Sequence, residues 1–315
     1  MVAPGDLLPV DAHPSPPRAR RIGLAVLGAS VVGLLAAAAL ARRESKPEPD
    51  ARARAARGLN GAAALLAGSV LADSSVEHYR GAFENPGMYA PLAVASATLL
   101  VNGGAFQSPG ARTPVHLIAV AVGAAGTAFH VYNLLRREGG LRWVNLFYGA
   151  PLGAPAALSL AGLLGLAADQ VRGSDTGQAP ELLGLPAGQA LAGLIGTGMA
   201  ATAGEAWLFH FRGAFHNPFM WLPVTMPPVA SALLVQSALV PNEEVPITSG
   251  WLGATALMGF AGVGFHIYGV SRNMGGWYNW SQNLLAGPPI PAPPSFTALA
   301  IAGLSALSLI GQARD

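Results

Sequence analysis

The sequence predicts an all-α integral membrane protein, built as a tandem duplication of a four-helix transmembrane unit in two parallel repeats after one N-terminal anchor helix. The first observation behind this prediction is composition. Of the 315 residues, 52% are hydrophobic and only 11% are charged, against roughly 25% charged in an ordinary soluble domain. Such a chain cannot cover a water-facing surface, so we expect the lipid bilayer to be its surroundings.

The second observation is an internal repeat. Residues 78–91 read HYRGAFENPGMYAP and residues 210–223 read HFRGAFHNPFMWLP. A later pair, FHVYNLLRREGG at 129–140 and FHIYGVSRNMGG at 265–276, is also similar. After two inserted residues the match continues, so that Asn145, Gly149 and Pro151 correspond to Asn283, Gly287 and Pro289. The chain is therefore a tandem duplication.

The N-terminal part precedes the duplicated region. Residues 1–21 form a Pro-rich tail that we expect to be disordered. Residues 22–41 form an apolar run with arginines on both flanks, which favours a retained anchor helix of about 30 Å. A basic start, an apolar run and small residues near its end also fit a cleaved signal peptide. Residues 42–58 read as a charged linker.

Eight apolar segments follow, four in each repeat, and the repeats cover residues 59–172 and 185–313. Most segments are near 20 residues long, and charges are nearly absent from their middles, as in transmembrane helices. They are rich in Ala, Leu and Gly without dyad alternation, which favours helices that pack closely in lipid. The segments are about 59–79, 88–105, 115–136, 148–168, 186–211, 219–240, 251–271 and 292–311.

An even number of helices per repeat gives both repeats the same orientation in the membrane. The first and third helices of a repeat then run the same way, and each carries a histidine toward its C-terminal end. We call the side predicted to hold His78, His130, His210 and His266 the histidine face. If only the short loops are counted, the positive-inside rule favours a cytoplasmic histidine face. When the linker is counted as well, each side of the membrane carries nine Lys and Arg residues, so the sequence does not decide which side the histidine face occupies.

Two acidic residues match across the repeats. Asp73 and Glu205 each lie five residues before a matched histidine, about 7 Å deeper along a regular helix. An ionisable group at that depth is a functional-site hypothesis. The matched partners are Arg80 and Arg212, seven residues later on the same helix face, so an ion pair that fixes the turn is the structural alternative.

The four histidines are candidate haem ligands. Neutral imidazole is a common metal ligand, and two histidines at similar depth on neighbouring helices can hold a b-type haem, with Arg80 and Arg212 on its propionates. A quinone site beside the histidine face is the related possibility. The alternative is that these histidines hydrogen-bond neighbouring helices or loop carbonyls.

A non-haem metal site would use the same four histidines as metal ligands. Glu77 and Asp73 add carboxylates suited to iron or manganese. However, Glu77 corresponds to Phe209 in the second copy, and Asp73 and His78 point about 140° apart on one helix, so several helices would have to contribute. Tyr132 and Tyr268 complete the polar network near the membrane surface, where interfacial aromatic residues lie.

These features predict a multi-pass subunit of the plasma (inner) membrane that transfers electrons for a soluble oxidoreductase subunit. A small-molecule or ion transporter and a non-catalytic assembly subunit are the alternatives. The absence of cysteine excludes disulfides, iron–sulfur clusters and c-type haem. The basic residues adjoin apolar runs, so we expect no nucleic-acid partner.

Overall fold

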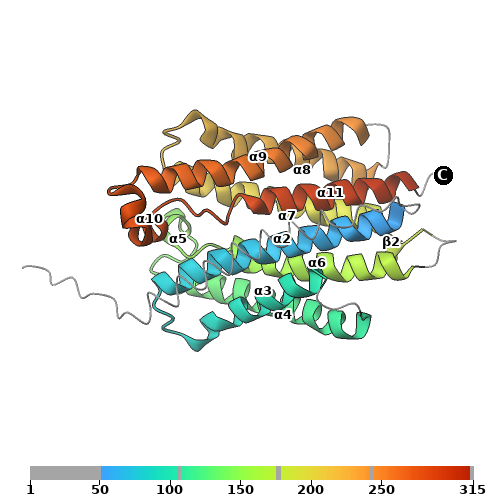
Figure 1. The fold of residues 1–315 in the computed structure, drawn as a ribbon, viewed down its shortest axis with the longest axis horizontal. Coiled ribbons are helices and arrows are strands. Elements are labelled where there is room, and N and C mark those ends of the chain that lie inside the picture. The colour runs from blue at the N-terminus through green and yellow to red at the C-terminus, as the bar shows by residue number, and fades with distance from the viewer. Residues whose placement is uncertain (1–50, 105–107, 175–178, 241–244, 313–315) are drawn as a thin grey trace, which may run out of the picture.

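The computed structural model describes residues 51–104, 108–174, 179–240 and 245–312. The predicted tail, the anchor helix 22–41 and most of the linker 42–58 lie outside these residues. Figure 1 shows long helices lying side by side along the longest axis of the molecule. The last linker residues belong to the first described helix, which begins at Ala51 rather than at residue 59.

Each predicted segment is helical in the structure, with ends displaced by a few residues. The first copy contains α2 (Ala51–Arg80), η1 (Pro86–Tyr89), α3 (Ala90–Asn102), α4 (Pro109–Leu135), α5 (Trp143–Tyr148) and α6 (Gly153–Gly173). A short antiparallel hairpin of β1 (Glu181–Leu182) and β2 (Leu185–Pro186) connects the copies. The second copy contains α7 (Ala187–Arg212), η2 (Pro218–Trp221), α8 (Leu222–Leu239), α9 (Val245–Arg272), η3 (Gly276–Asn279), α10 (Trp280–Ala286) and α11 (Pro294–Gln312).

Six helices in the described part of the chain are long and apolar enough to cross a membrane: α2, α4, α6, α9, α11 and the continuous η2–α8 segment. This confirms the prediction of an all-α protein with membrane-length apolar helices. Two of the eight predicted spans are not among the six. Helix α3 has 13 residues, or about 20 Å at 1.5 Å per residue, which is short of a hydrocarbon core of about 30 Å. Helix α7 has the length but carries Glu205, His210 and Arg212 in its second half.

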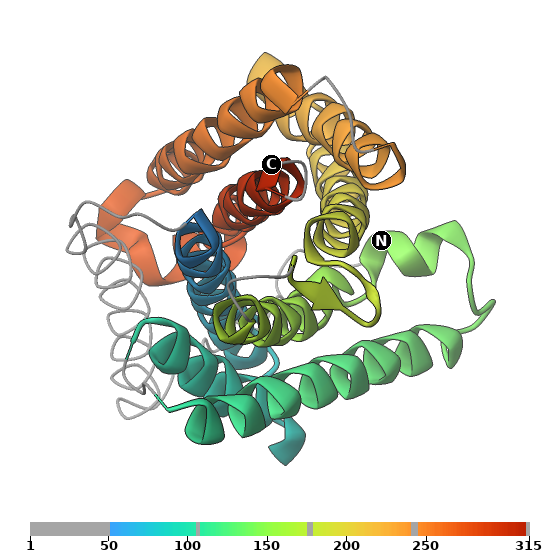
Figure 2. The ribbon, with the colours of Figure 1, turned by 90° about the vertical axis from the view of Figure 1, so that its right-hand side faces the viewer.

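The bundle has a central group of helices and an outer group. Figure 2 shows α2, α6, α7 and α11 at the centre, with α3 and α4 on one side and α8 and α9 on the other. The apolar window of α2 is 78% buried and that of α11 is 67% buried, against 17% in α4 and in α9. The outer helices therefore offer their apolar residues to the surroundings, as lipid-facing helices do.

Helices from the two copies make corresponding contacts. Helix α2 packs on α3 and α6 packs on α4, as α7 packs on α8 and α11 packs on α9. Glycines permit the close approach that the composition predicts. A Cβ on Gly123 in α4 would lie 2.4 Å from the backbone nitrogen of Ser159, and a Cβ on the matched Gly259 in α9 would lie 2.8 Å from that of Thr297. Between the copies, α2 packs on α11 and α6 packs on α7.

Candidate functional site

The doubled motif forms the same turn at the ends of α2 and α7. Ala82 and Phe83 both have φ of 51°, and the matched Ala214 and Phe215 have φ of 54° and 46°. Four non-glycine residues in the left-handed region are strained. In each copy the phenylalanine N–H donates to the carbonyl oxygen of the motif histidine at 3.1 Å, which closes the helix end.

Other residues of the motif serve this turn. The Oδ1 of Asn85 accepts the N–H of Gly87 at 2.8 Å, and the Oδ1 of Asn217 accepts that of Phe219 at 3.0 Å, so each caps a 3-10 helix. A Cβ on Gly81 would lie 3.0 Å from the methyl carbon of Met88. Much of the RGAF–NP signature is thus explained by backbone geometry, and the methyl group of Met88 lies close to the turn glycine.

The histidines are positioned by backbone carbonyls. The Nδ1 of His78 lies 2.6 Å from the carbonyl oxygen of Met88. The Nδ1 of His130 lies 2.7 Å from that of Pro151, and the Nδ1 of His266 lies 2.6 Å from that of Pro289. A carbonyl oxygen only accepts, so Nδ1 must donate in all three rings. A neutral ring in this tautomer has its lone pair on Nε2.

His210 differs from the other three. Its Nδ1 is buried and has no hydrogen-bond partner among the residues that the structure describes. His78 and His130 are close enough to interact electrostatically, and so are His210 and His266. The structure therefore brings the histidines together as one pair in each copy.

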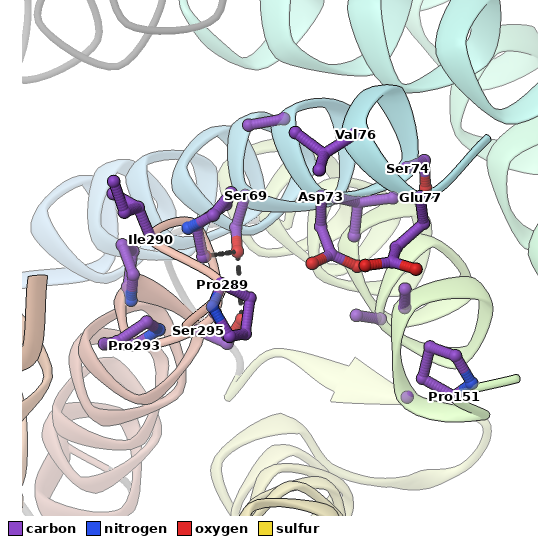
Figure 3. A pocket seen from close by; sticks show the side chains of 18 of the residues that line it. Ser69, Asp73, Ser74, Val76, Glu77, Pro151, Pro289, Ile290, Pro293 and Ser295 are labelled. Atoms are coloured by element: carbon purple, nitrogen blue, oxygen red, sulfur yellow. Dashed lines mark hydrogen bonds between the residues drawn. The ribbon is translucent and has the colours of Figure 1, made fainter. Parts of the chain in front are cut away.

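One cavity of about 3260 Å³ reaches all four histidines. Asp73, Glu77, Glu205, Arg80 and Arg212 also line it. Figure 3 shows Asp73 and Glu77 side by side on α2, with their carboxylates toward this space. The helices α5 and α10, which follow α4 and α9, lie together at one end of the molecule in Figure 1.

The ion pairs considered as the structural alternative, Asp73 with Arg80 and Glu205 with Arg212, do not form within the described residues, where other contacts replace them. The Nη1 of Arg80 lies 2.7 Å from the Oε1 of Glu77, one turn away. The Oε1 of Glu205 accepts the backbone N–H of Gly153 at 2.9 Å, at the start of α6. Spacing along α7 could not show the partner of Glu205, because that partner is the start of a neighbouring helix.

Arg212 lies over aromatic rings. Its Cζ is 5.4 Å from the ring centre of Phe209, 5.5 Å from that of Phe147 and 5.8 Å from that of Tyr148. Cation–π contact at these distances holds the guanidinium without neutralising its charge. The matched arginines Arg80 and Arg212 thus have different surroundings.

Tyr132 and Tyr268 lie beside arginines at the same end of the bundle. The Cζ of Arg136 is 5.5 Å from the ring centre of Tyr132, and that of Arg272 is 5.7 Å from the ring centre of Tyr268. Both tyrosines are exposed, and Tyr268 also borders the cavity. A matched Tyr–Arg pair at the end of α4 and α9 suits the interface between lipid and water.

In the part of the chain that the structure describes, no three His, Asp or Glu side chains gather as a metal ion requires. This removes support from the non-haem iron or manganese site built on Glu77, Asp73 and the histidines. A haem iron needs only two protein ligands, so the same finding does not bear on a pair of imidazoles.

A buried charged cluster was missed from the sequence. Arg112 on α4 is 3% exposed, and its Nε donates to Asp169 on α6 at 2.8 Å. Its Nη1 donates to the carbonyl of Val101 at 2.9 Å and its Nη2 to the Oδ1 of Asn60 at 2.9 Å. The fully buried His116 lies 3.4 Å from Asp169. The available signal was Arg112 and His116 one turn apart on an apolar helix.

Comparison with known proteins finds no match to a family, to a curated protein or to a solved structure. The site must therefore be interpreted from its own residues.

Proposed function

We propose that the chain is a membrane electron-transfer subunit that holds b-type haem between paired histidines, His78 with His130 and His210 with His266. The observation that supports this most is the carbonyl-bound Nδ1–H of three of the four rings. Histidines that ligate a metal commonly donate the other ring N–H to a carbonyl, which fixes the tautomer and the ring orientation. The same contact leaves Nε2 available as a ligand.

The surrounding residues fit a haem. The cavity of about 3260 Å³ exceeds the ~300–1,000 Å³ of ordinary ligand pockets, so it has room for more than one planar group. Arg80 and Arg212 line it and carry charges suited to propionates. When bound, haem supplies one-electron transfer, while this chain's residues hold its iron, orient its plane and exclude water.

The pairs are unequal. His210 lacks the Nδ1 contact that orients the other rings, so we expect the His78–His130 pair to bind haem more tightly than the His210–His266 pair. A loss of orientation of this kind costs about 10–100-fold in metal affinity.

The experiment is an absorption spectrum and a haem titration of the detergent-purified full chain. We expect a Soret band that falls by about half in His130→Ala. The remaining band should come from haem at the His210–His266 pair and should titrate with the weaker affinity. The control His216→Ala removes a histidine of the turn whose Nδ1 bonds only locally, to the carbonyl of Gly213 at 3.0 Å. A folded, colourless protein that does not take up added haem would refute the proposal.

A small-molecule or ion carrier is the second candidate, favoured by carboxylates from both copies around one cavity. Asp73 and Glu205 line the cavity and interact electrostatically across the boundary between the copies. Substrate sites in duplicated carriers lie at such boundaries. Uptake into proteoliposomes that is lost in Asp73→Asn would favour this function over the first.

The remaining architecture is part of the proposal. The corresponding contacts of the two copies support a duplicated four-helix unit whose repeats run parallel through the membrane. We place the chain in the plasma membrane with its histidine face toward a soluble oxidoreductase subunit, because the described residues form little mass outside the helices. Co-purification of a soluble subunit with the chain, lost on changes at Arg136 and Arg272, tests this placement.

A further inference from the structure

Two carboxylates at matched positions have different environments. Glu205 on α7 and Asp73 on α2 each lie five residues before a motif histidine, and both line the cavity. Each helix packs on a helix of the other copy, α7 on α6 and α2 on α11. By the duplication, Asp73 should meet the start of α11 as Glu205 meets the start of α6.

Glu205 is fixed at the start of α6. Its Oε1 accepts the N–H of Gly153 at 2.9 Å, and a Cβ on Gly153 would lie 1.8 Å from its Oε2. The carboxylate thus rests directly on the helix end. The unpaired N–H groups and the dipole of a helix N-terminus favour a negative charge there.

The residue matched to Gly153 is Pro291. Pro151 and Pro289 are matched, because their carbonyl oxygens accept from the matched histidines His130 and His266. Gly153 and Pro291 each lie two residues later, so they are matched as well. Proline has no N–H, so the start of the second copy's last helix lacks the donor that Glu205 uses.

The carbonyl of Pro291 accepts a hydrogen bond from the hydroxyl of Ser69, and the Ser69 Oγ also lies 3.1 Å from the Oγ of Ser295. Ser69 stands one turn before Asp73 on the same face of α2, and Figure 3 shows these contacts beside Asp73. The segment before α11 is therefore held to α2 by serine, without using the carboxylate.

Asp73 is left without a donor. No hydrogen bond or salt bridge of Asp73 occurs within the described residues, although every other membrane acid discussed here has one. The charged groups that face it are Glu77 and Arg80 on its own helix and Glu205 on α7. Arg80 is already paired with Glu77. The negative charge of Asp73 is therefore most simply neutralised by binding a proton.

We infer that Asp73 is a proton-binding site open to the cavity, whereas Glu205 is a fixed carboxylate that holds the start of α6. A carboxylic acid can exchange its proton with the cavity, whereas protonating a carboxylate at a helix N-terminus weakens the charge-assisted contact that holds it there. The two copies therefore supply one exchanging acid, not two. The inference does not depend on what the histidines bind.

Dicyclohexylcarbodiimide tests this inference, because it adds to protonated carboxyl groups in apolar surroundings. The detergent-purified full chain is labelled and the adducts are located by peptide mass spectrometry. We expect at least about tenfold more adduct on Asp73 than on Glu205, the ratio that one charge-assisted hydrogen bond confers. Both sites are compared within one wild-type chain, so no variant has to fold for the main result.

Two variants assign the adduct. Asp73→Asn should lose it, and the matched control Glu77→Gln, one turn away on α2, should keep it. Equal labelling of Asp73 and Glu205, preferential labelling of Glu205 or absence of label on Asp73 would each overturn the inference. A colourless protein labelled at Asp73 would refute the haem proposal and leave this inference standing.

Discussion

The buried cluster around Arg112 gives the sharpest stability prediction. Replacing Arg112 with threonine, the residue at the matched position Thr248, removes the guanidinium that Asp169 binds at 2.8 Å and the donor of the Asn60 side-chain oxygen. The Val101 carbonyl loses one of its donors and keeps the N–H of Gly104 at 3.3 Å, and Asp169 keeps Arg172 at the longer distance of 3.9 Å. Arg112 is 3% exposed and the Asp169 side chain is 13% exposed, so water cannot replace these contacts. Removing one member of a buried ion pair costs about 3–5 kcal/mol, and we expect Arg112→Thr to lose that much.

The second copy provides the control, because it fills the same space without a charged residue. The matched positions hold Ala192, Thr248, Leu252 and Leu307, all nearly or fully buried. The variant that combines Asn60→Ala, Arg112→Thr, His116→Leu and Asp169→Leu should therefore recover most of the loss, since a well-packed apolar substitute for a buried ion pair is often neutral. The free energy of unfolding is measured in mixed micelles by circular dichroism. A cost below about 1 kcal/mol for Arg112→Thr, or no recovery in the combined variant, would refute the reasoning.

Two further predictions use the same unfolding measurement. A Cβ on Gly165 would lie 2.4 Å from the Cε1 of His116, so Gly165→Ala should cost about 1–3 kcal/mol by overpacking. Gly61→Ala, with nothing within 4 Å of the added carbon, should instead stabilise α2 by about 0.5–1 kcal/mol; a similar loss in both would contradict the contact. Asn85→Ala should cost about 1 kcal/mol and Asn85→Ser much less, because the side-chain oxygen caps η1; equal losses would argue against capping.

The helices were predictable from sequence because an apolar run of membrane length predicts a helix without any information about its neighbours. Each of the eight predicted segments is helical, and several prolines stand at helix starts where a missing N–H costs little, although Pro227 and Pro228 lie inside α8. The length of α3 was overestimated, since its end was set at residue 105 whereas the helix ends at Asn102. The motif's turn was also foreseen, although the left-handed conformation of Ala82 and Phe83 was not. Neither residue type signals a positive φ.

The partners of the charged residues were not predictable, because they come from other helices. Spacing along α7 placed Arg212 near Glu205, but the structure gives Glu205 the N–H of Gly153 and gives Arg212 three aromatic rings. Asp169 was overlooked for the same reason, since its partner Arg112 lies 57 residues earlier. A repeat reveals which positions match, but it does not show which helices touch.

The matched sequence positions of the two copies do not have matched surroundings. His130 and His266 keep the same carbonyl contact, while His78 has the Met88 carbonyl and His210 has no Nδ1 partner in the described chain. At the far end of the bundle the first copy holds the buried Arg112–Asp169 pair, whereas the matched positions of the second copy are uncharged. Under the proposed function, the oriented histidine pair and the exchangeable acid of the first copy carry more of the chemistry than their counterparts in the second. On this reasoning, changes at His78 should affect activity more than changes at His210, and equal effects would restore the simpler account of two equivalent sites.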